Sequence, residues 1–261
     1  MKKKSDVLFL LPCLLGIVIF WIIPFVKSFY YAWIDNTFAK EYVGLLNIKN
    51  VINNEYFRLA MMNTLCFTII SVLLIMLLTI ILSLLIARYA MRFTIIRSAF
   101  FLPVFLPSAT VVMLWNAYMS QITPFNSLLI LYLWKYLGLN IVILLTGIAA
   151  IPKDMIDAAK IDGAGNLYQD FYLILPNISP TIFFAAILSI MNSLKIYKES
   201  YLLYGRYPDD SVYMMQNYLD NHFYKLNYQN ISSAAIIFAV IIYLIIGIIY
   251  LIEERWERQL W

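Results

Sequence analysis

Cysteine and histidine are almost absent from this chain. Its 261 residues include two cysteines, Cys13 and Cys66, and one histidine, His222. So few cysteines exclude a disulfide-stabilised secreted scaffold, and both lie in apolar runs that predict small buried hydrophobes. A single histidine without a neighbouring cysteine or second histidine gives no basis for a histidine metal site or a Ser-His-Asp triad. His222 is therefore interpreted as a loop residue.

Charge is also scarce. Lys, Arg, Asp and Glu make up 13% of the residues, about half the usual share, whereas apolar residues make up 63%. A soluble globule cannot bury that much apolar surface, so the bilayer must be the solvent for most of it. The same composition excludes disorder. The net charge of +4 comes without a basic cluster or a base-reading motif, so nucleic-acid binding is not expected.

Several apolar runs are long enough to cross a bilayer as helices, which takes about 20 residues. The first run follows Lys2, Lys3 and Lys4 but lacks the small-residue exit of a signal peptide, so we expect a retained helix. Alternating strands of the barrel type are absent. The sequence thus predicts an all-α, polytopic membrane protein with six transmembrane helices. They are expected at 7–26, 61–87, 98–119, 128–150, 178–194 and 231–252.

Basic residues predict how these helices are oriented. Arg88, Arg92 and Arg97 lie in one short connection, 88–97, that has no acidic residue. Because cytoplasmic loops carry an excess of Lys and Arg, both termini are expected in the cytoplasm of a multi-pass protein of the cell membrane. Three parts are predicted along the chain. They are an N-terminal transmembrane helix with its exterior loop (1–60), a transmembrane core (61–252) and a cytoplasmic tail (253–261).

The connection 151–177, on the predicted cytoplasmic side, has the residues of two short helices. Pro152 suits a first helical turn, and Asp154 and Asp157 suit the positive helix start. Either Gly163 or Gly165 can end that helix in a left-handed conformation.

A second helix is predicted after the glycines. Asn166 and Gln169 resemble a capping box that opens it, and Pro176 is expected to end it. From the residues alone, this helix-turn-helix either receives another protein or rests on the lipid headgroups.

The same connection resembles the EAA loop of ABC-importer permeases, whose pattern is Glu-Ala-Ala-x3-Gly-x9-Ile-x-Leu-Pro. Aspartate replaces the first glutamate, which keeps the charge but shortens its reach by one methylene. Further resemblance lies at 63–67 and 97–103, and it extends over 7–252 to carbohydrate permeases of the MalF/UgpA type. The matching loop residues are Asp157, Ala158, Ala159, Asp162, Gly163, Ala164, Phe171, Leu175 and Pro176.

The resemblance implies a permease subunit that imports a sugar or oligosaccharide. Its implied partners are a cytoplasmic ABC ATPase dimer, a second permease of similar fold and an extracytoplasmic solute-binding protein. Residues 154–175 are expected to dock in a groove of one ATPase of that dimer. The chain has no P-loop sequence, so ATP and magnesium belong to the ATPase and no cofactor is expected here. Two alternatives are a permease for another small solute, such as a polyamine or phosphate, and an integral membrane enzyme. Acidic residues are missing from the predicted spans, which argues against a cationic substrate.

Polar residues inside the spans are candidates for the translocation pathway. Lys135 is the one ionisable residue well inside a run; it either donates into a cavity or extends to the outer interface. The uncharged candidates either contact sugar or make hydrogen bonds between helices. These are Trp115, Asn116, Asn140, Asn192 and Ser193.

Overall fold

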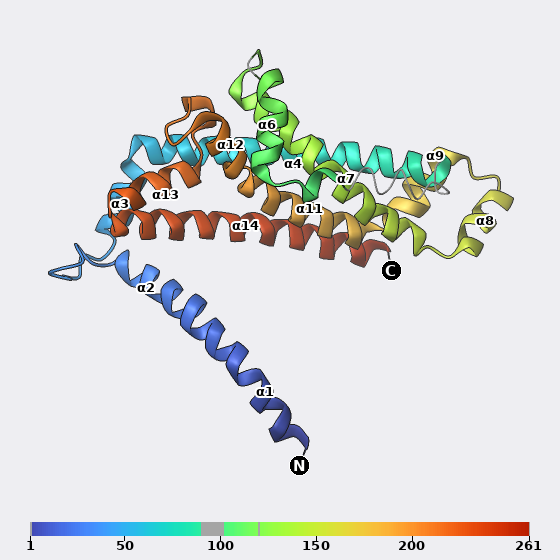
Figure 1. Cartoon of the computed structure of the whole chain (residues 1–261). Coiled ribbons are helices and arrows are strands. Elements are labelled where there is room, and N and C mark those ends of the chain that lie inside the picture. Colours follow the sequence, from blue (N-terminus) through green and yellow to red (C-terminus); the bar gives the residue numbers. More distant parts are fainter. Residues whose placement is uncertain (1, 90–101, 120, 261) are drawn as a thin grey trace. The chain divides into compact units, whose positions relative to one another are not determined.

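The computed structural model describes residues 2–89, 102–119 and 121–260 (Figure 1). Within these ranges the chain is helical, with one isolated antiparallel bridge between Ile34 and Tyr42 and no named strand. The all-α expectation is therefore confirmed for the described residues.

Among the described residues, five helical segments are long and apolar enough to cross a membrane. The first, Leu10–Tyr31, joins α1 (Lys2–Ile17), a π-helical turn (Val18–Ile22) and α2 (Ile23–Tyr31). The others are formed by α4 (Glu55–Tyr89), α7 (Pro124–Ala149), α11 with α12 (Ser179–Lys195 and Tyr197–Tyr204) and α14 (Tyr228–Leu260).

The expected span 98–119 is not among these five. Residues 98–101 lie outside the described ranges, and the described part contains α6 (Ser108–Met119), which at 12 residues is too short to cross by itself. The sixth helix and the membrane orientation stay predictions.

The chain divides into two compact units. Unit 1 comprises residues 1–61 and 215–242, and it contains α3 (Leu46–Asn53) and α13 (Met215–Tyr224). Asn47 Nδ2 donates to the carbonyls of Ala32 and Ile34 at 3.0 and 2.8 Å, which fixes the turn after α2. His222 lies in α13, so its interpretation as a loop residue was wrong.

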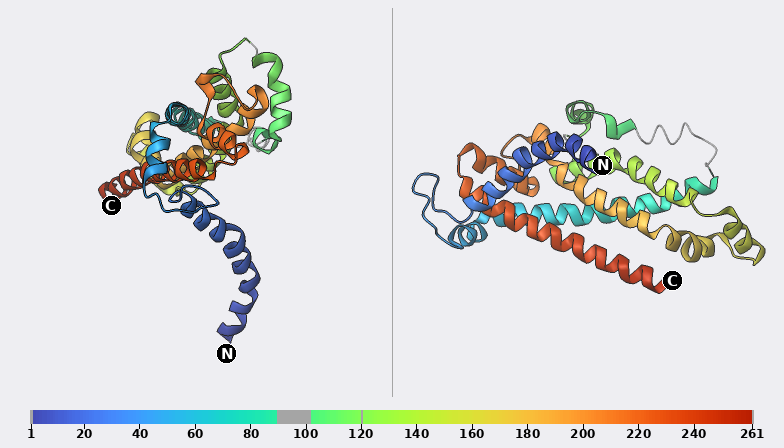
Figure 2. Two further views of the ribbon diagram at one scale, coloured as in Figure 1. Left: turned by 90° about the vertical axis from the view of Figure 1, so that its left-hand side faces the viewer. Right: turned by 90° about the horizontal axis from the view of Figure 1, so that it is seen from below.

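Unit 2 comprises residues 62–214 and 243–261. Figures 1 and 2 show α4, α7 and α11 lying lengthwise beside one another, with the 151–177 connection at one end of these helices. The fully buried side chains of Phe67 and Ile75 on α4 pack with Leu131 and Tyr132 on α7. A second apolar cluster, including Leu144, lies nearer the 151–177 connection.

Helices α7 and α11 approach closely at Gly147. A Cβ atom at this glycine would lie 2.8 Å from Thr181 Oγ1, closer than side chains pack. The remaining short elements are α8 (Lys153–Ile161), α9 (Asn166–Gln169), a π-helical turn η2 (Asp170–Ile174), α10 (Leu175–Asn177) and η3 (Asp210–Val212).

Both cysteines lie on exposed helix surfaces, so the prediction that they are buried was wrong. The physical reason is that a bilayer surrounds these helices, and an apolar thiol facing lipid needs no protein cover.

Candidate functional site

The first helix of the 151–177 connection is α8, which begins at Lys153 and has Pro152 as its N-cap residue. The Met155 N–H donates to the Pro152 carbonyl at 3.2 Å, and Asp154 lies in the first turn, where its charge favours the helix start. No residue of α8 is buried, and Asp157 forms an exposed ion pair with Lys160 at 3.0 Å. The helix therefore presents Asp157 and Ala158 at the surface, with Ala159 half-buried beside them.

Gly163 ends α8 in the left-handed conformation, with φ of +80°. Its N–H donates to the Lys160 carbonyl at 3.1 Å, and the Ala164 N–H donates to the Ala159 carbonyl at 2.9 Å. These two bonds make a Schellman motif, which satisfies carbonyls that the helix end leaves free. Gly165 has φ of −66° and needs no special backbone conformation. The structure thus selects Gly163 from the two glycines that the sequence left open.

The second helix begins differently from the prediction. Gly165, not Asn166, is the N-cap residue of α9, and no side chain caps it, so the predicted capping box was wrong. The Gln169 side chain instead donates from Nε2 to the Ala164 carbonyl at 2.7 Å, on the other side of the turn. This bond uses the amide that the capping box would have needed, and it ties the turn to α9.

The helical path continues through η2 to Pro176. The Leu175 N–H donates to the Asp170 carbonyl five residues back, a π-helical spacing directly before the proline. Since proline has no N–H and clashes with the carbonyl four residues earlier, the wider turn accommodates it. Pro176 itself lies in α10, so the helical path passes through the proline and ends one residue later, at Asn177.

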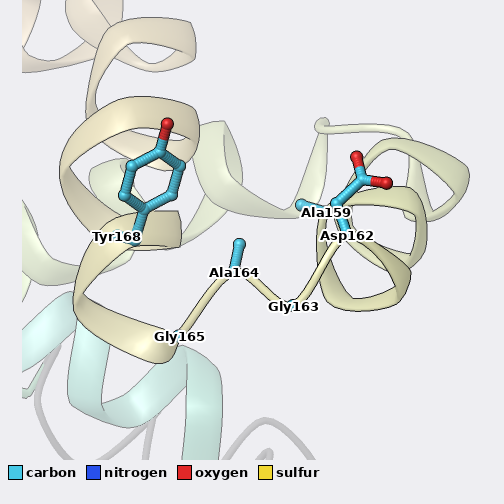
Figure 3. A pocket seen from close by; sticks show the side chains of 6 residues that line it. All are labelled: Ala159, Asp162, Gly163, Ala164, Gly165 and Tyr168. Atoms are coloured by element: carbon cyan, nitrogen blue, oxygen red, sulfur yellow. The ribbon is translucent and has the colours of Figure 1, made fainter.

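An open hollow of about 430 Å³ lies at the turn between α8 and α9 (Figure 3). Figure 3 shows Asp162 and Ala159 on one side, Tyr168 on the other, and Gly163 and Ala164 in the turn between them. The hollow is lined by Ala159, Asp162, Gly163, Ala164, Gly165 and Tyr168, so four of the predicted motif residues meet there.

Other apolar side chains of the same connection are exposed. Phe171 is 63% exposed, and Ile161, Leu167 and Tyr172 are still more exposed. Leu175 and Pro176 are half-buried, and Leu175 packs against the apolar cluster at the ends of α4, α7 and α11. The connection therefore has an inner side fixed to the helices and an outer side whose apolar residues are exposed among the described residues of unit 2.

One ion pair of this region was not predicted. Arg88 Nη2, in the last turn of α4, lies 2.7 Å from Asp170 Oδ1 and also donates to the Asn166 carbonyl at 3.1 Å. Asp170 is buried and Arg88 is half-buried. No local pattern could indicate a pair separated by 82 residues.

Lys135 is buried in an ion pair that neither sequence alternative described. Its Nζ lies 2.5 Å from Glu199 Oε1, and Ser108 Oγ donates to the same carboxylate oxygen at 2.7 Å. Glu199 belongs to α12 and is 1% exposed. A carboxylate that the sequence assigned to a connecting segment thus lies inside the bundle.

The other polar candidates divide into two groups. Asn140 Nδ2 donates to Ser189 Oγ at 2.8 Å between α7 and α11, and Ser193 Oγ donates to Thr68 Oγ1 at 3.0 Å between α11 and α4. These two residues make hydrogen bonds between helices, as one alternative expected.

Trp115, Asn116 and Asn192 have different surroundings. Trp115 is half-buried with its ring centroid 5.3 Å from that of Trp134, Asn116 is exposed, and Asn192 is buried. The structure does not bring all six candidates together at one surface.

Comparison with known families gives the chain its class. Residues 87–258 match the family model described as "Binding-protein-dependent transport system inner membrane component". This match covers the 151–177 connection and both polar clusters around Lys135 and Arg88.

Curated relatives align over almost the whole chain. A probable starch degradation products transport system permease, AmyD of Thermoanaerobacterium thermosulfurigenes, is 25% identical, with 94% of this chain and 91% of the relative covered. The trehalose/maltose transport system permease MalF of Thermococcus litoralis is 26% identical, with 99% and 96% covered. An arabinooligosaccharides transport system permease, AraP of Bacillus subtilis, is 24% identical, with 96% and 88% covered.

Solved structures share the fold. A chain of a bacterial ABC transporter that imports the acidic polysaccharide alginate superposes with a TM-score of 0.81 at 20% identity, covering 97% of this chain and 96% of that chain. A second structure, of a bacterial alginate ABC transporter with an alginate pentasaccharide-bound periplasmic protein, gives 0.79 at 22% identity, with 98% and 96% covered. The chain belongs to the family of binding-protein-dependent transport system inner membrane components and is a multi-pass permease subunit of an ABC importer in the cell membrane, without an ATPase site of its own.

Proposed function

We propose that this permease imports a sugar or oligosaccharide delivered by a solute-binding protein. The observation that carries the proposal is the full-length alignment with relatives named for starch degradation products, trehalose/maltose and arabinooligosaccharides. The neighbouring structures of an alginate importer agree with this substrate class.

Six transmembrane helices with both termini in the cytoplasm form the proposed topology. The transmembrane core is 61–252, between an N-terminal helix with its exterior loop (1–60) and a short tail (253–261). The five apolar helical segments and the basic residues of 88–97 support this arrangement.

The 151–177 connection is the proposed coupling loop, which docks in a groove of one subunit of a cytoplasmic ATPase dimer that binds ATP and magnesium. Two features support this role: the hollow at Gly163 and the exposed apolar side chains of the same connection. A protein that buries these side chains gains free energy roughly in proportion to the apolar area removed from water. ATP-driven closure of the ATPases would then move the loop and rock this subunit against a second permease of similar fold.

The translocation pathway is proposed to lie along Trp115 and Asn116. Asn116 is exposed on α6, and the neighbouring Trp115 ring offers an aromatic face for a sugar ring. Lys135, Asn140 and Ser193 are assigned to contacts inside the bundle, because their polar groups already bond to neighbouring helices. Asn192 is kept as a pathway candidate.

Reconstitution tests the proposal. The chain is co-expressed with the ATPase, second permease and solute-binding protein of its host, and ATP hydrolysis is measured in proteoliposomes. Binding protein loaded with maltose, trehalose or arabinotriose should stimulate hydrolysis, whereas spermidine and phosphate should not. Stimulation by spermidine or phosphate alone would replace the sugar assignment with another solute class.

A further inference from the structure

The two halves of the coupling loop are held to the bundle in different ways. No residue of α8 is buried, whereas Gln169 and Asp170 of the second half are. The half-buried Ile156 is the α8 residue that packs against the apolar cluster at the helix ends. The first half is thus free to dock, and the second half is fixed.

Arg88 supplies the polar part of this fixation. Its Nη2 atom contacts Asp170 Oδ1 at 2.7 Å and the Asn166 carbonyl at 3.1 Å, so it joins successive turns of the second half to the end of α4. The two side chains are 25% and 8% exposed, whereas those of Lys160 and Asp157 on α8 are 59% and 64% exposed. A charge-assisted bond at a largely buried carboxylate holds its geometry far better than an exposed pair on one helix surface.

A continuous series of bonds leads from Arg88 to α8. Arg88 holds Asp170 and Asn166, and Gln169 between them donates to the Ala164 carbonyl. Ala164 is in turn bonded through its N–H to the Ala159 carbonyl of α8. A displacement of α8 therefore reaches α4 through these contacts, in addition to the covalent connections to α7 and α11.

We propose that Arg88 is a positioning residue of the coupling loop, which makes α4 move with the loop when the ATPases close. This inference rests on the proposed function of the loop. Arg88 is not proposed to bind the ATPase; it keeps the second half of the loop at a fixed place on α4. Loss of the contact should uncouple loop displacement from the transmembrane helices without preventing insertion or assembly.

The test uses the reconstituted complex with Arg88→Met, Asp170→Asn, the conservative Arg88→Lys, and the exchange Arg88→Asp with Asp170→Arg. The control is Arg58→Met at the other end of α4, where the guanidinium also contacts a carbonyl, that of Ile52 at 2.7 Å. Two quantities are measured: hydrogen exchange of amides 169–175, and maltose transported per ATP hydrolysed, using the sugar that stimulates the wild type if maltose does not.

Arg88→Met and Asp170→Asn should speed exchange of amides 169–175 and lower transport per ATP by roughly 2- to 30-fold. Arg88→Lys and the charge exchange should recover part of both, and Arg58→Met should change neither. Wild-type ATP hydrolysis that does not respond to loaded binding protein would overturn the proposed function. The inference about Arg88 alone would be overturned if the wild type responds to loaded binding protein but Arg88→Met leaves both the amide exchange and the transport per ATP unchanged. If Arg88→Met fails to assemble, Arg88→Lys and the charge exchange decide the question. Positioning would be refuted if both variants lost transport per ATP while their amides 169–175 exchanged at the wild-type rate.

Discussion

Lys135 and Glu199 form an ion pair inside unit 2, with Nζ 2.5 Å from Oε1 and both side chains almost fully buried. The pair joins α7 to α12, and Ser108 at the start of α6 donates to the same carboxylate. Two consecutive helices, α6 and α7, thus meet the more distant α12 at one carboxyl group.

Removing one partner of this pair should strongly destabilise the protein. Glu199→Leu leaves an uncompensated buried ammonium, which costs about 3–5 kcal/mol, whereas Lys135→Met with Glu199→Leu removes both charges and should recover most of the loss. The apparent melting temperature of the detergent-purified protein measures this, with Asn116→Ala as an exposed control. A double variant no more stable than the single one would contradict the pairing.

A comparison of two glycines tests the turn of the coupling loop. A Cβ would meet nothing within 4 Å at either Gly163 or Gly165, but Gly163 alone has positive φ. Gly163→Ala should therefore cost roughly 1–2 kcal/mol locally and weaken co-purification with the ATPase, whereas Gly165→Ala should be neutral. Equal behaviour of the two variants would show that the left-handed conformation is not required. Gly163→Asp should break assembly or coupling while leaving membrane insertion intact.

The close approach of α7 and α11 predicts a steric effect at Gly147. Gly147→Ala would place Cβ 2.8 Å from Thr181 Oγ1, and such overpacking costs about 1–3 kcal/mol. Thr181→Ala removes Oγ1 and Cγ2 but keeps Cβ at 3.1 Å, so it should restore only part of the melting temperature. Full tolerance of Gly147→Ala alone would mean that the two helices can separate at this point.

His222 should make the stability of unit 1 dependent on pH. Burial lowers the pKa of this histidine below 6.5, although the Tyr218 carbonyl, 3.0 Å from Nδ1, acts against that shift. Because the folded pKa lies below the unfolded one, its stabilisation is present above pH 6.5 and is lost as the pH falls through the folded pKa. His222→Gln should flatten the melting-temperature difference between pH 7.5 and 5.5. An undiminished difference in that variant would assign the effect to other groups.

Short-range features of the loop could be predicted from the sequence because the responsible residues are neighbours. The helix after Pro152 and the left-handed turn at Gly163 or Gly165 follow from local hydrogen bonds and backbone conformation. The capping box could not be judged in this way, since Gly165 competes with Asn166 for the same N-cap position, and the Gln169 amide found the Ala164 carbonyl instead.

The ion pairs depend on packing and lay beyond local patterns. Glu199 lies beyond the end of the predicted span 178–194 and was therefore assigned to a connecting segment. The helical path of α11 and α12 nevertheless carries it to Lys135, 64 residues away. Arg88 was read only as a topology signal, because its partner Asp170 lies in another part of the chain. The small number of charged residues was the available signal, because a charged side chain that is buried needs a partner of opposite charge.

Helix α4 contacts the segment 170–193, which includes most of α11, at two points along its length. Thr68 meets Ser193 of α11, and Arg88 meets Asp170 shortly before α11 begins. At 1.5 Å per residue these two attachments lie about 30 Å apart, close to the thickness of the hydrocarbon layer. Because α4 is attached at both depths, we expect it to move together with α11. The two helices should move as one element and transmit a displacement at one membrane face to the other.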